Sequence, residues 1–274
     1  MNLGACSINF HLKMLTKEII NFANYLADIS EEIAKKYFRL DNGEITKDDD
    51  SPVTKADREI EKIIREEIEK KFPDHGIIGE EFGDKNTDAD FVWILDPIDG
   101  TSSFIIGRPI FGTLIALTYK GKSVLGIMNQ PILGERWVGI DGVGATFNGK
   151  KIQTRNCTEL ANSVICSSSS FYFQNGDEEI LKRLCATAKY QKLGGIIYGG
   201  DCYSYASLAS GFVDIVLDPG LKVYDYAALQ PIIEMAGGVV TDWRGNDLKL
   251  KSNVKLVASA NAQLHEKVLR NLNS

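Results

Sequence analysis

WILDPIDGT, at residues 93–101, joins an apolar, strand-like run to two carboxylates that stand three residues apart. Residues 91–95 have the composition of a buried strand, and the proline and glycine that follow predict a turn. Asp96 and Asp99 are therefore expected to lie together at the end of this strand. A site made only of carboxylate oxygens favours Mg²⁺ or Mn²⁺ over zinc.

Two further segments carry acids next to apolar runs. Upstream, IIGEE at residues 77–81 ends in two glutamates, of which Glu80 comes first. Far downstream, Asp225 precedes an apolar, helix-like segment that closes with AGGVV at residues 236–240. Three such segments can converge on one acidic cluster.

In this order and at this spacing, the three motifs resemble those of the inositol monophosphatase superfamily, a group of Mg²⁺-dependent, lithium-sensitive phosphatases. The resemblance covers the chain from about Leu15 onward. It implies an α+β fold, a layered αβαβα sandwich of the inositol monophosphatase and sugar phosphatase type, with the site between two halves. It also implies a homodimer, which the sequence alone does not derive.

The bulk composition narrows the class of protein. A net charge of −6 provides no positive electrostatic field that would attract nucleic acid. A phosphate group must therefore be bound by local groups, namely by metal. Five widely spaced cysteines without a CxxC pair indicate a reducing cytoplasm rather than a disulfide framework. The apolar runs are too short for a membrane span, and the first residues lack the pattern of a signal peptide.

Hydrophobic periodicity indicates the order of the elements. Apolar residues recur every three to four positions over residues 15–37 and 55–71, which predicts two amphipathic helices. The pattern then becomes that of strands, with a hairpin at Asn148-Gly149. The later part alternates strands and helices, and one of these helices is predicted over residues 225–235.

This order predicts two halves after a short extension. Residues 1–13 are expected to be a disordered extension. Residues 14–152 form an α+β half that carries most metal ligands. Residues 153–274 form an α/β half that carries Asp225 and the substrate contacts.

The resemblance assigns metal-binding roles to five residues. Asp96 bridges two ions. Glu80 and the carbonyl of Ile98 complete the first site, and Asp99 with Asp225 completes the second. The implied cofactor is Mg²⁺, with two or three ions per site and Mn²⁺ as a possible substitute. Aspartates beside a proline also form turns, which is the simpler alternative for this motif.

The resemblance also implies that Glu80, Thr101 and Asp57 orient and deprotonate the attacking water. Asp57 has a structural alternative, because Thr54 and Asp57 match the S/T-x-x-D pattern of a capping box. The sequence pattern alone favours the cap, whereas the resemblance favours a catalytic pairing of Asp57 with Thr101.

The residues after the second aspartate of the motif are expected to bind the phosphate. A helix that starts after Gly100 offers free amides, and the glycine allows a close approach of the backbone. Asp99, Gly100, Thr101 and Ser102 are the expected contacts. The alternative is that Thr101 or Ser102 is merely the N-cap of this helix.

Two segments of the later half, YGGDCYSY at residues 198–205 and LKVYD at residues 221–225, resemble motifs of the histidinol-phosphate phosphatase branch of the superfamily. Asp201 and Asp218 are the expected partners for the ammonium and imidazole of histidinol phosphate. Both acids can instead cap a helix or face solvent. Ile197 departs from the branch, which often has arginine at that position.

The sequence therefore predicts a Mg²⁺-dependent phosphomonoesterase that converts L-histidinol phosphate and water to L-histidinol and phosphate by attack of a metal-activated water. Inositol 1-phosphate or another small phosphorylated metabolite is the alternative substrate. A non-catalytic interaction protein on the same fold is the alternative of another class. No nucleic acid or membrane partner is expected.

Overall fold

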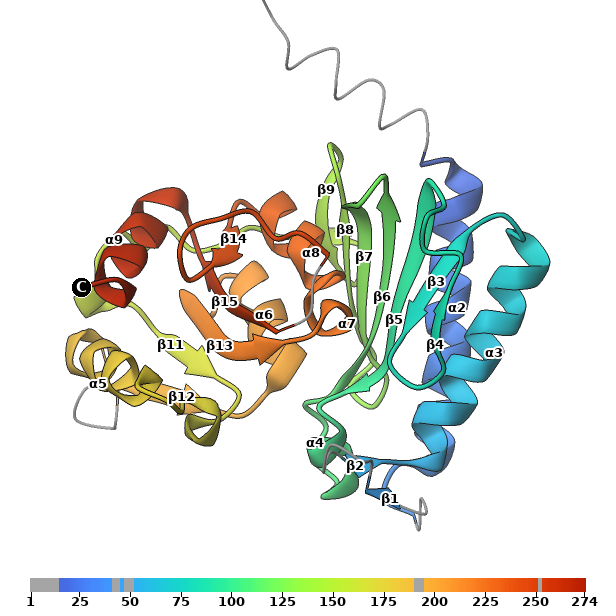
Figure 1. The fold of residues 1–274 in the computed structure, drawn as a ribbon, viewed down its shortest axis with the longest axis horizontal. Helices are drawn as coiled ribbons and strands as arrows, with labels where there is room; N and C mark the ends of the chain where they lie inside the picture. The colour runs from blue at the N-terminus through green and yellow to red at the C-terminus, as the bar shows by residue number, and fades with distance from the viewer. Residues whose placement is uncertain (1–14, 41–44, 47–51, 190–194, 251–252) are drawn as a thin grey trace, which may run out of the picture.

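The computed structural model describes residues 15–40, 45–46, 52–189, 195–250 and 253–274. The extension expected over residues 1–13 lies outside the described residues. The chain is built in five layers, in the order helix, sheet, helix, sheet, helix (Figure 1). The predicted αβαβα sandwich is therefore confirmed.

The first layer is a pair of amphipathic helices, α2 (Lys17–Tyr37) and α3 (Lys55–Lys71). Thr16 caps α2 by accepting a hydrogen bond from the Ile19 amide, and Thr54 caps α3. Each helix buries its apolar stripe against the large sheet, as the spacing of its apolar residues predicts. No helix among the described residues is both long and apolar enough to cross a membrane.

The second layer is an eight-stranded sheet with the order β10-β9-β8-β7-β6-β5-β3-β4. Neighbouring strands are antiparallel except β3 and β5, which run parallel. A separate ribbon pairs β1 with β2. The bounds are β1 (Ile45–Thr46), β2 (Pro52–Val53), β3 (Gly76–Gly79), β4 (Gly83–Lys85), β5 (Phe91–Asp99), β6 (Gly112–Tyr119), β7 (Lys122–Gln130), β8 (Glu135–Ile140), β9 (Gly144–Phe147) and β10 (Lys150–Lys151).

The fourth layer is a five-stranded sheet with the order β12-β11-β13-β15-β14. β11 runs parallel to β12 and β13, and the other pairs are antiparallel. The last layer, α5 (Asp177–Thr187) and α9 (Ala262–Leu272), covers its outer face (Figure 1). The strand bounds are β11 (Ile165–Ser167), β12 (Ile196–Tyr198), β13 (Ile215–Leu221), β14 (Val239–Asp242) and β15 (Val254–Ser259), with 3-10 turns at Leu160–Asn162 and Ser170–Tyr172.

The middle layer consists of α6 (Asp201–Ala209), α7 (Val223–Tyr226) and α8 (Leu229–Met235). α8 packs directly on the large sheet because two strands carry glycine where it crosses them. A Cβ at Gly126 would lie 1.9 Å from the Ala228 carbonyl oxygen. A Cβ at Gly139 would lie 2.4 Å from the Ile232 nitrogen. The close approach joins apolar residues of both sheets and of this layer in one core.

Two elements near the predicted site differ from expectation. β5 continues through the proline to Asp99, where the sequence predicts a turn, and the short helix α4 (Thr101–Ile105) follows. The helix predicted over residues 225–235 is two helices, α7 and α8, with a turn at residues 227–228 between them. The division of the chain at residue 152 stays a prediction.

Candidate active site

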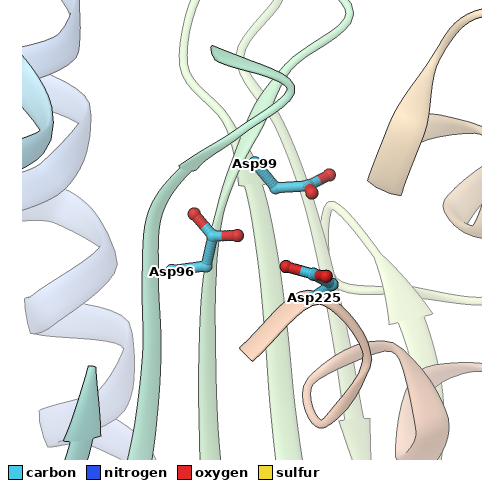
Figure 2. Close-up of side chains that lie close together, drawn as sticks. All are labelled: Asp96, Asp99 and Asp225. Atoms are coloured by element: carbon cyan, nitrogen blue, oxygen red, sulfur yellow. The ribbon is translucent and has the colours of Figure 1, made fainter. Parts of the chain in front are cut away.

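Three aspartates from two distant segments meet at the end of β5 (Figure 2). Asp96 and Asp99 belong to β5, and Asp225 belongs to α7. One carboxylate oxygen from each lies within 4.8 Å of those from the other two. Oxygen atoms at such separations can surround one hard cation.

An irregularity in β5 brings Asp96 and Asp99 to the same place. In a regular strand, residues three apart point to opposite faces of the sheet. Here Asp96 pairs with Leu114 of β6. Asp99 pairs with Gly112, so three steps along β5 match only two along β6. A proline within this bulge is tolerated because the ladder is already interrupted.

Asp225 reaches the cluster from the middle layer. It is the third residue of α7, and its Oδ2 accepts a hydrogen bond of 2.7 Å from the Lys222 amide. This contact fixes the side chain at the start of the helix, where Figure 2 shows its carboxylate facing those of Asp96 and Asp99.

Glu80 lies next to the three aspartates because β3 pairs in parallel with β5. Gly79 pairs with Leu95, so Glu80, directly after β3, stands beside Asp96 within β5. The amide of Glu80 also donates a hydrogen bond of 3.3 Å to the Leu95 carbonyl. Glu80 therefore lies beside Asp96, and its charge acts on that carboxylate.

Burial and mutual repulsion favour the protonated form of these acids. Burial raises the pKa of Asp96 well above its usual range, and the charges of Glu80 and Asp99 raise it further. Burial likewise raises the pKa of Asp99, with added repulsion from Asp201 and Asp225. The pKa of Asp225 is raised to about 7, mainly by burial.

The donor set of the cluster fits a divalent cation. Asp96 Oδ1 is buried and has no hydrogen-bond partner among the described residues. The charged neighbours that perturb the pKa of Asp96 are all acidic. An unsatisfied, buried oxygen costs free energy, which a bound cation would recover. The cluster is therefore compatible with Mg²⁺, which prefers oxygen ligands.

The turn after β5 carries the next predicted residues. The Thr101 hydroxyl donates a hydrogen bond of 3.0 Å to the Ile98 carbonyl. Gly100 has a φ of 83°, and a Cβ there would lie 2.9 Å from Asp201 Oδ2. α4 begins after Gly100 without a side-chain cap, so the alternative that Thr101 or Ser102 is merely its N-cap is wrong.

Asp57 makes the capping contact that its sequence pattern predicts. Its Oδ2 accepts hydrogen bonds from the amide and the hydroxyl of Thr54, at 2.8 and 2.5 Å. Its Oδ1 is buried and has no hydrogen-bond partner in the described part of the chain. Burial raises the pKa of Asp57 to about 7, and the charges of Glu81 and Glu80 add to the effect. A catalytic pairing of Asp57 with Thr101 stays a prediction.

A cavity of about 330 Å³ opens beside the acidic cluster. Its wall is made by Glu80, the turn after β5, the start of α6 and the segment that leads into α7. The volume and the polar wall suit a small phosphorylated molecule. The lining residues that lie outside the motifs found in the sequence are Ser168, Tyr172, Pro219 and Gly220.

Asp201 lines this cavity at the first position of α6. Its own φ is 37°, an uncommon conformation for a residue other than glycine, and it follows Gly200 with a φ of 104°. The next amide, that of Cys202, donates a hydrogen bond of 2.6 Å to Asp99 Oδ2. This bond ties α6 to the acidic cluster and leaves the Asp201 carboxylate at the wall, with Ser168 as a hydrogen-bond partner.

Asp218 has a different place from the one that the sequence predicts. It is fully buried in β13 and does not line the cavity. Its carboxylate accepts hydrogen bonds from the Ser167 hydroxyl, the Ser168 amide and hydroxyl, and the Tyr205 hydroxyl. The carboxylate oxygens of Asp218 are therefore already occupied by hydrogen bonds. Asp218 does not contact substrate in the cavity but orients two residues of its wall, Ser168 and Tyr205.

Glu61 is a buried acid near the site that the motif analysis does not identify. It lies in α3, four residues after Asp57, and its side chain is fully buried. Its carboxylate accepts hydrogen bonds from the amides of Glu81 and Phe82, directly after Glu80. The spacing to Asp57 places both acids on one face of the helix, which is the only signal in the sequence.

Comparison with known protein sequences gives a consistent result. The profile of the inositol monophosphatase family matches residues 15–274. A chloroplastic bifunctional phosphatase of Arabidopsis thaliana, IMPL2, is 45% identical over 258 residues, which cover 91% of this chain and 73% of the relative. A histidinol-phosphatase of Chlorobaculum parvum is 37% identical over 229 residues, which cover 82% of this chain and 86% of the relative.

Comparison with solved structures agrees in fold. An inositol monophosphatase from Zymomonas mobilis superposes with a TM-score of 0.85 at 40% identity. The match covers 94% of this chain and 98% of that one. The likeness in fold therefore extends through both sheets and the helices that pack on them.

Proposed function

The chain belongs to the inositol monophosphatase family and is a phosphatase, and from this premise we propose that it hydrolyses histidinol phosphate to histidinol and phosphate with Mg²⁺. The observation that carries the substrate assignment is Asp201, a carboxylate on the cavity wall within contact distance of Gly100, next to the acidic cluster. A phosphate bound at the cluster would put the organic part of its ester against this acid. Histidinol carries an ammonium and an imidazole that an acid can pair with.

The proposed metal ligands are the carboxylates of Glu80, Asp96, Asp99 and Asp225 with the carbonyl of Ile98. The acidic, partly unsatisfied donor set supports this assignment. When bound, divalent ions would offset the charge of the phosphoryl oxygens and make a water molecule more acidic. We propose two or three ions per site, with Mn²⁺ as a substitute for Mg²⁺.

Protein groups would position the water and the phosphate. The Thr101 hydroxyl gives its only proton to Ile98, so its lone pairs stay available to accept a hydrogen bond from water. Asp57, with a pKa raised to about 7, suits acceptance of the water proton at neutral pH, together with Glu80. The amides at the start of α4, from Thr101 and Ser102, have no partner within the helix and would hold phosphoryl oxygens.

The reaction is a direct displacement. The oxygen of water forms a bond to phosphorus while the bond to the alcohol oxygen of histidinol breaks. The alcohol oxygen takes up a proton, and the proton lost by water passes to a carboxylate of the site. No side chain forms a covalent bond to phosphorus in this proposal.

Inositol 1-phosphate is the second candidate substrate, supported by the 40% identical inositol monophosphatase of Zymomonas mobilis. Side-by-side values of kcat/KM for histidinol phosphate, inositol 1-phosphate and glycerol 2-phosphate test the proposal. We expect histidinol phosphate to be preferred by at least tenfold, about 1.4 kcal/mol of differential transition-state binding. An equal or higher value for inositol 1-phosphate contradicts the assignment and leaves the phosphatase activity intact.

The family supports three further proposals. We propose that the protein is a homodimer, which light scattering at about twice the chain mass of 30.3 kDa would support. Millimolar lithium is expected to inhibit it. A reducing, cytoplasmic setting is proposed because the described cysteines are unpaired, namely Cys157, Cys166, Cys185 and Cys202.

A further inference from the structure

Glu61 lies where α3 meets the turn that carries Glu80. Asp57, Glu61 and Arg65 are spaced four residues apart, so they form one stripe on the helix. Glu61 is fully buried, and the side chain of Arg65 is 12% exposed. A charged residue in this position is rare unless all its oxygens have partners.

The Glu61 carboxylate has partners in the turn and on its own helix. Oε2 accepts a hydrogen bond of 2.8 Å from the Glu81 amide. Oε1 accepts one of 3.2 Å from the Phe82 amide and one of 2.7 Å from Arg65 Nε. Arg65 also donates a hydrogen bond to the carbonyl of Gly83. Glu61 and Arg65 together therefore hold both ends of the segment 81–83 by hydrogen bonds.

The contact with β3 is equally close. A Cβ at Gly79 would lie 2.0 Å from Glu61 Oε1, so only glycine leaves room for the carboxylate at this point. On the other side, the Glu80 amide is bonded to the Leu95 carbonyl of β5. The backbone of Glu80 is therefore fixed from both sides, by β5 and by Glu61.

We propose that Glu61 is a positioning residue that, together with Arg65, clamps the segment 81–83 and so holds the Glu80 carboxylate at the acidic cluster. The proposal rests on the proposed role of Glu80 as a metal ligand. α3 then sets two acids of the site at once, since Asp57 is fixed at its start by the Thr54 cap and Glu80 is fixed through Glu61. A glutamine cannot replace Glu61 fully, because its amide group is a donor facing other donors.

The test compares Glu61→Gln with Glu69→Gln. Glu69 lies on the same helix and pairs with Lys85 of β4 at 2.9 Å, but its side chain is 44% exposed and makes no contact with the turn amides. Mn²⁺ binding without substrate, followed by electron paramagnetic resonance, is the first readout. We expect Glu61→Gln to weaken Mn²⁺ binding about tenfold or more, as for other groups that orient metal ligands, and Glu69→Gln to leave it within about twofold.

The second readout is kinetic. In the wild-type background, Glu61→Gln is expected to raise the half-saturating Mg²⁺ concentration about tenfold. In the Glu80→Gln background, the same substitution is expected to change turnover by less than about twofold, because the group that it positions is already lost. The proposal would be overturned if Glu61→Gln bound Mn²⁺ as tightly as the wild type. It would also be overturned if the loss of turnover in the Glu61→Gln/Glu80→Gln variant were the product of the losses in the two single variants.

Two measurements keep the test decisive. If Glu61→Gln does not fold, because Arg65 loses its partner, the pair variant Glu61→Gln/Arg65→Gln removes both charges and is expected to fold with the same loss of Mn²⁺ affinity. If the wild-type protein hydrolyses no phosphate that is tried, the proposed function fails. The Mn²⁺ titration still decides the role of Glu61 in that case.

Discussion

Two groups of buried aspartates stand on the two sheets, and they differ in what surrounds them. On the large sheet, Asp96 and Asp99 face other acids, and Asp96 keeps one oxygen without a hydrogen-bond partner among the described residues. On the smaller sheet, Asp218 accepts hydrogen bonds from three serine and tyrosine hydroxyls and one amide. Just before that strand, Asp214 accepts from Arg155 and from the Val164 amide.

The difference separates a functional use of aspartate from a structural one. A buried carboxylate surrounded by donors contributes to the fold, whereas a buried carboxylate surrounded by acids raises the free energy of the metal-free protein. Asp96, Asp214 and Asp218 are alike in residue type and burial. The partners of each carboxylate distinguish the acids that we propose to bind a cation from those that stabilise the fold.

The largest expected effect is that of Asp96→Asn. Mg²⁺-dependent kcat/KM should fall about a thousandfold or more, because the cluster loses its central ligand. The metal-free variant should nevertheless be more stable at neutral pH, with Tm raised by about 2 to 4 °C, because asparagine is neutral without the proton that buried Asp96 must take up on folding. Steady-state kinetics and calorimetry in the presence of a chelator check both effects. Substantial Mg²⁺-dependent turnover, or a lower Tm, would contradict the comparison.

His265, beside the smaller sheet, and the acidic cluster should respond to pH with opposite signs. His265 is 4% exposed and lies between the hydroxyls of Ser259 and Thr241, and burial lowers its pKa from 6.5 to about 4. Its unfolded form binds a proton that the folded form does not, so stability is lost as pH falls from about 6.5 to about 4. The loss amounts to about 3 kcal/mol.

The acidic cluster acts in the other direction. The raised pKa values of Asp96, Asp99 and Asp225 mean that the metal-free fold holds protons that the unfolded chain has lost. Their contribution to stability is present near pH 4 and is lost as pH rises, for Asp225 as pH reaches about 7. Denaturant unfolding at pH 4.5 and 6.5, with Asp96→Asn and His265→Gln, separates the two slopes. If the pH dependence of the free energy of unfolding were unchanged in both variants, other titratable groups would determine it.

Asp214→Asn tests the structural side of the comparison. We expect a loss of about 2 kcal/mol in the free energy of unfolding, because Arg155 and the Val164 amide lose their charged acceptor and Arg155 is only partly buried. The half-saturating Mg²⁺ concentration should not change.

The matched control for that variant is Glu266→Gln, which removes an exposed pair with Arg270 on α9. Its free energy of unfolding should stay within about 0.5 kcal/mol of the wild type. A loss in Asp214→Asn no larger than in this control would place Asp214 among the acids that contribute nothing to the fold.

Most of the acidic cluster was predictable because its acids lie next to short apolar runs in the sequence. Asp99 ends β5, Glu80 directly follows β3 and Asp225 is the third residue of α7, whereas Asp96 lies within β5 and is brought beside Asp99 by the bulge. Helices were predictable for a similar local reason. The helix over Lys55–Lys71 has both its cap and its apolar stripe within its own sequence.

The rest depends on contacts between segments far apart in the chain. The partners of Asp218 come from β11 and α6, so no local pattern distinguishes it from an acid on the cavity wall. Glu61 is recognised by amides twenty residues later in the chain. The bulge in β5 depends on its pairing with β6, which the periodicity of one strand does not reveal. The turn between α7 and α8 falls within one apolar run of the sequence.

The smallest expected effect, that of Asp201→Asn, bears on an acid that belongs to neither group. Asp201 lines the cavity, is half-buried and shares its charge with a hydrogen bond to Ser168, so its attraction for a cation is partly screened. We expect kcat/KM for histidinol phosphate to fall about tenfold, the lower end for loss of a charged contact. Turnover of glycerol 2-phosphate and the Mg²⁺ requirement should stay nearly intact, because the metal acids lie elsewhere. Equal losses on both esters would make Asp201 a structural residue at the start of α6, and the substrate assignment would then rest on family likeness alone.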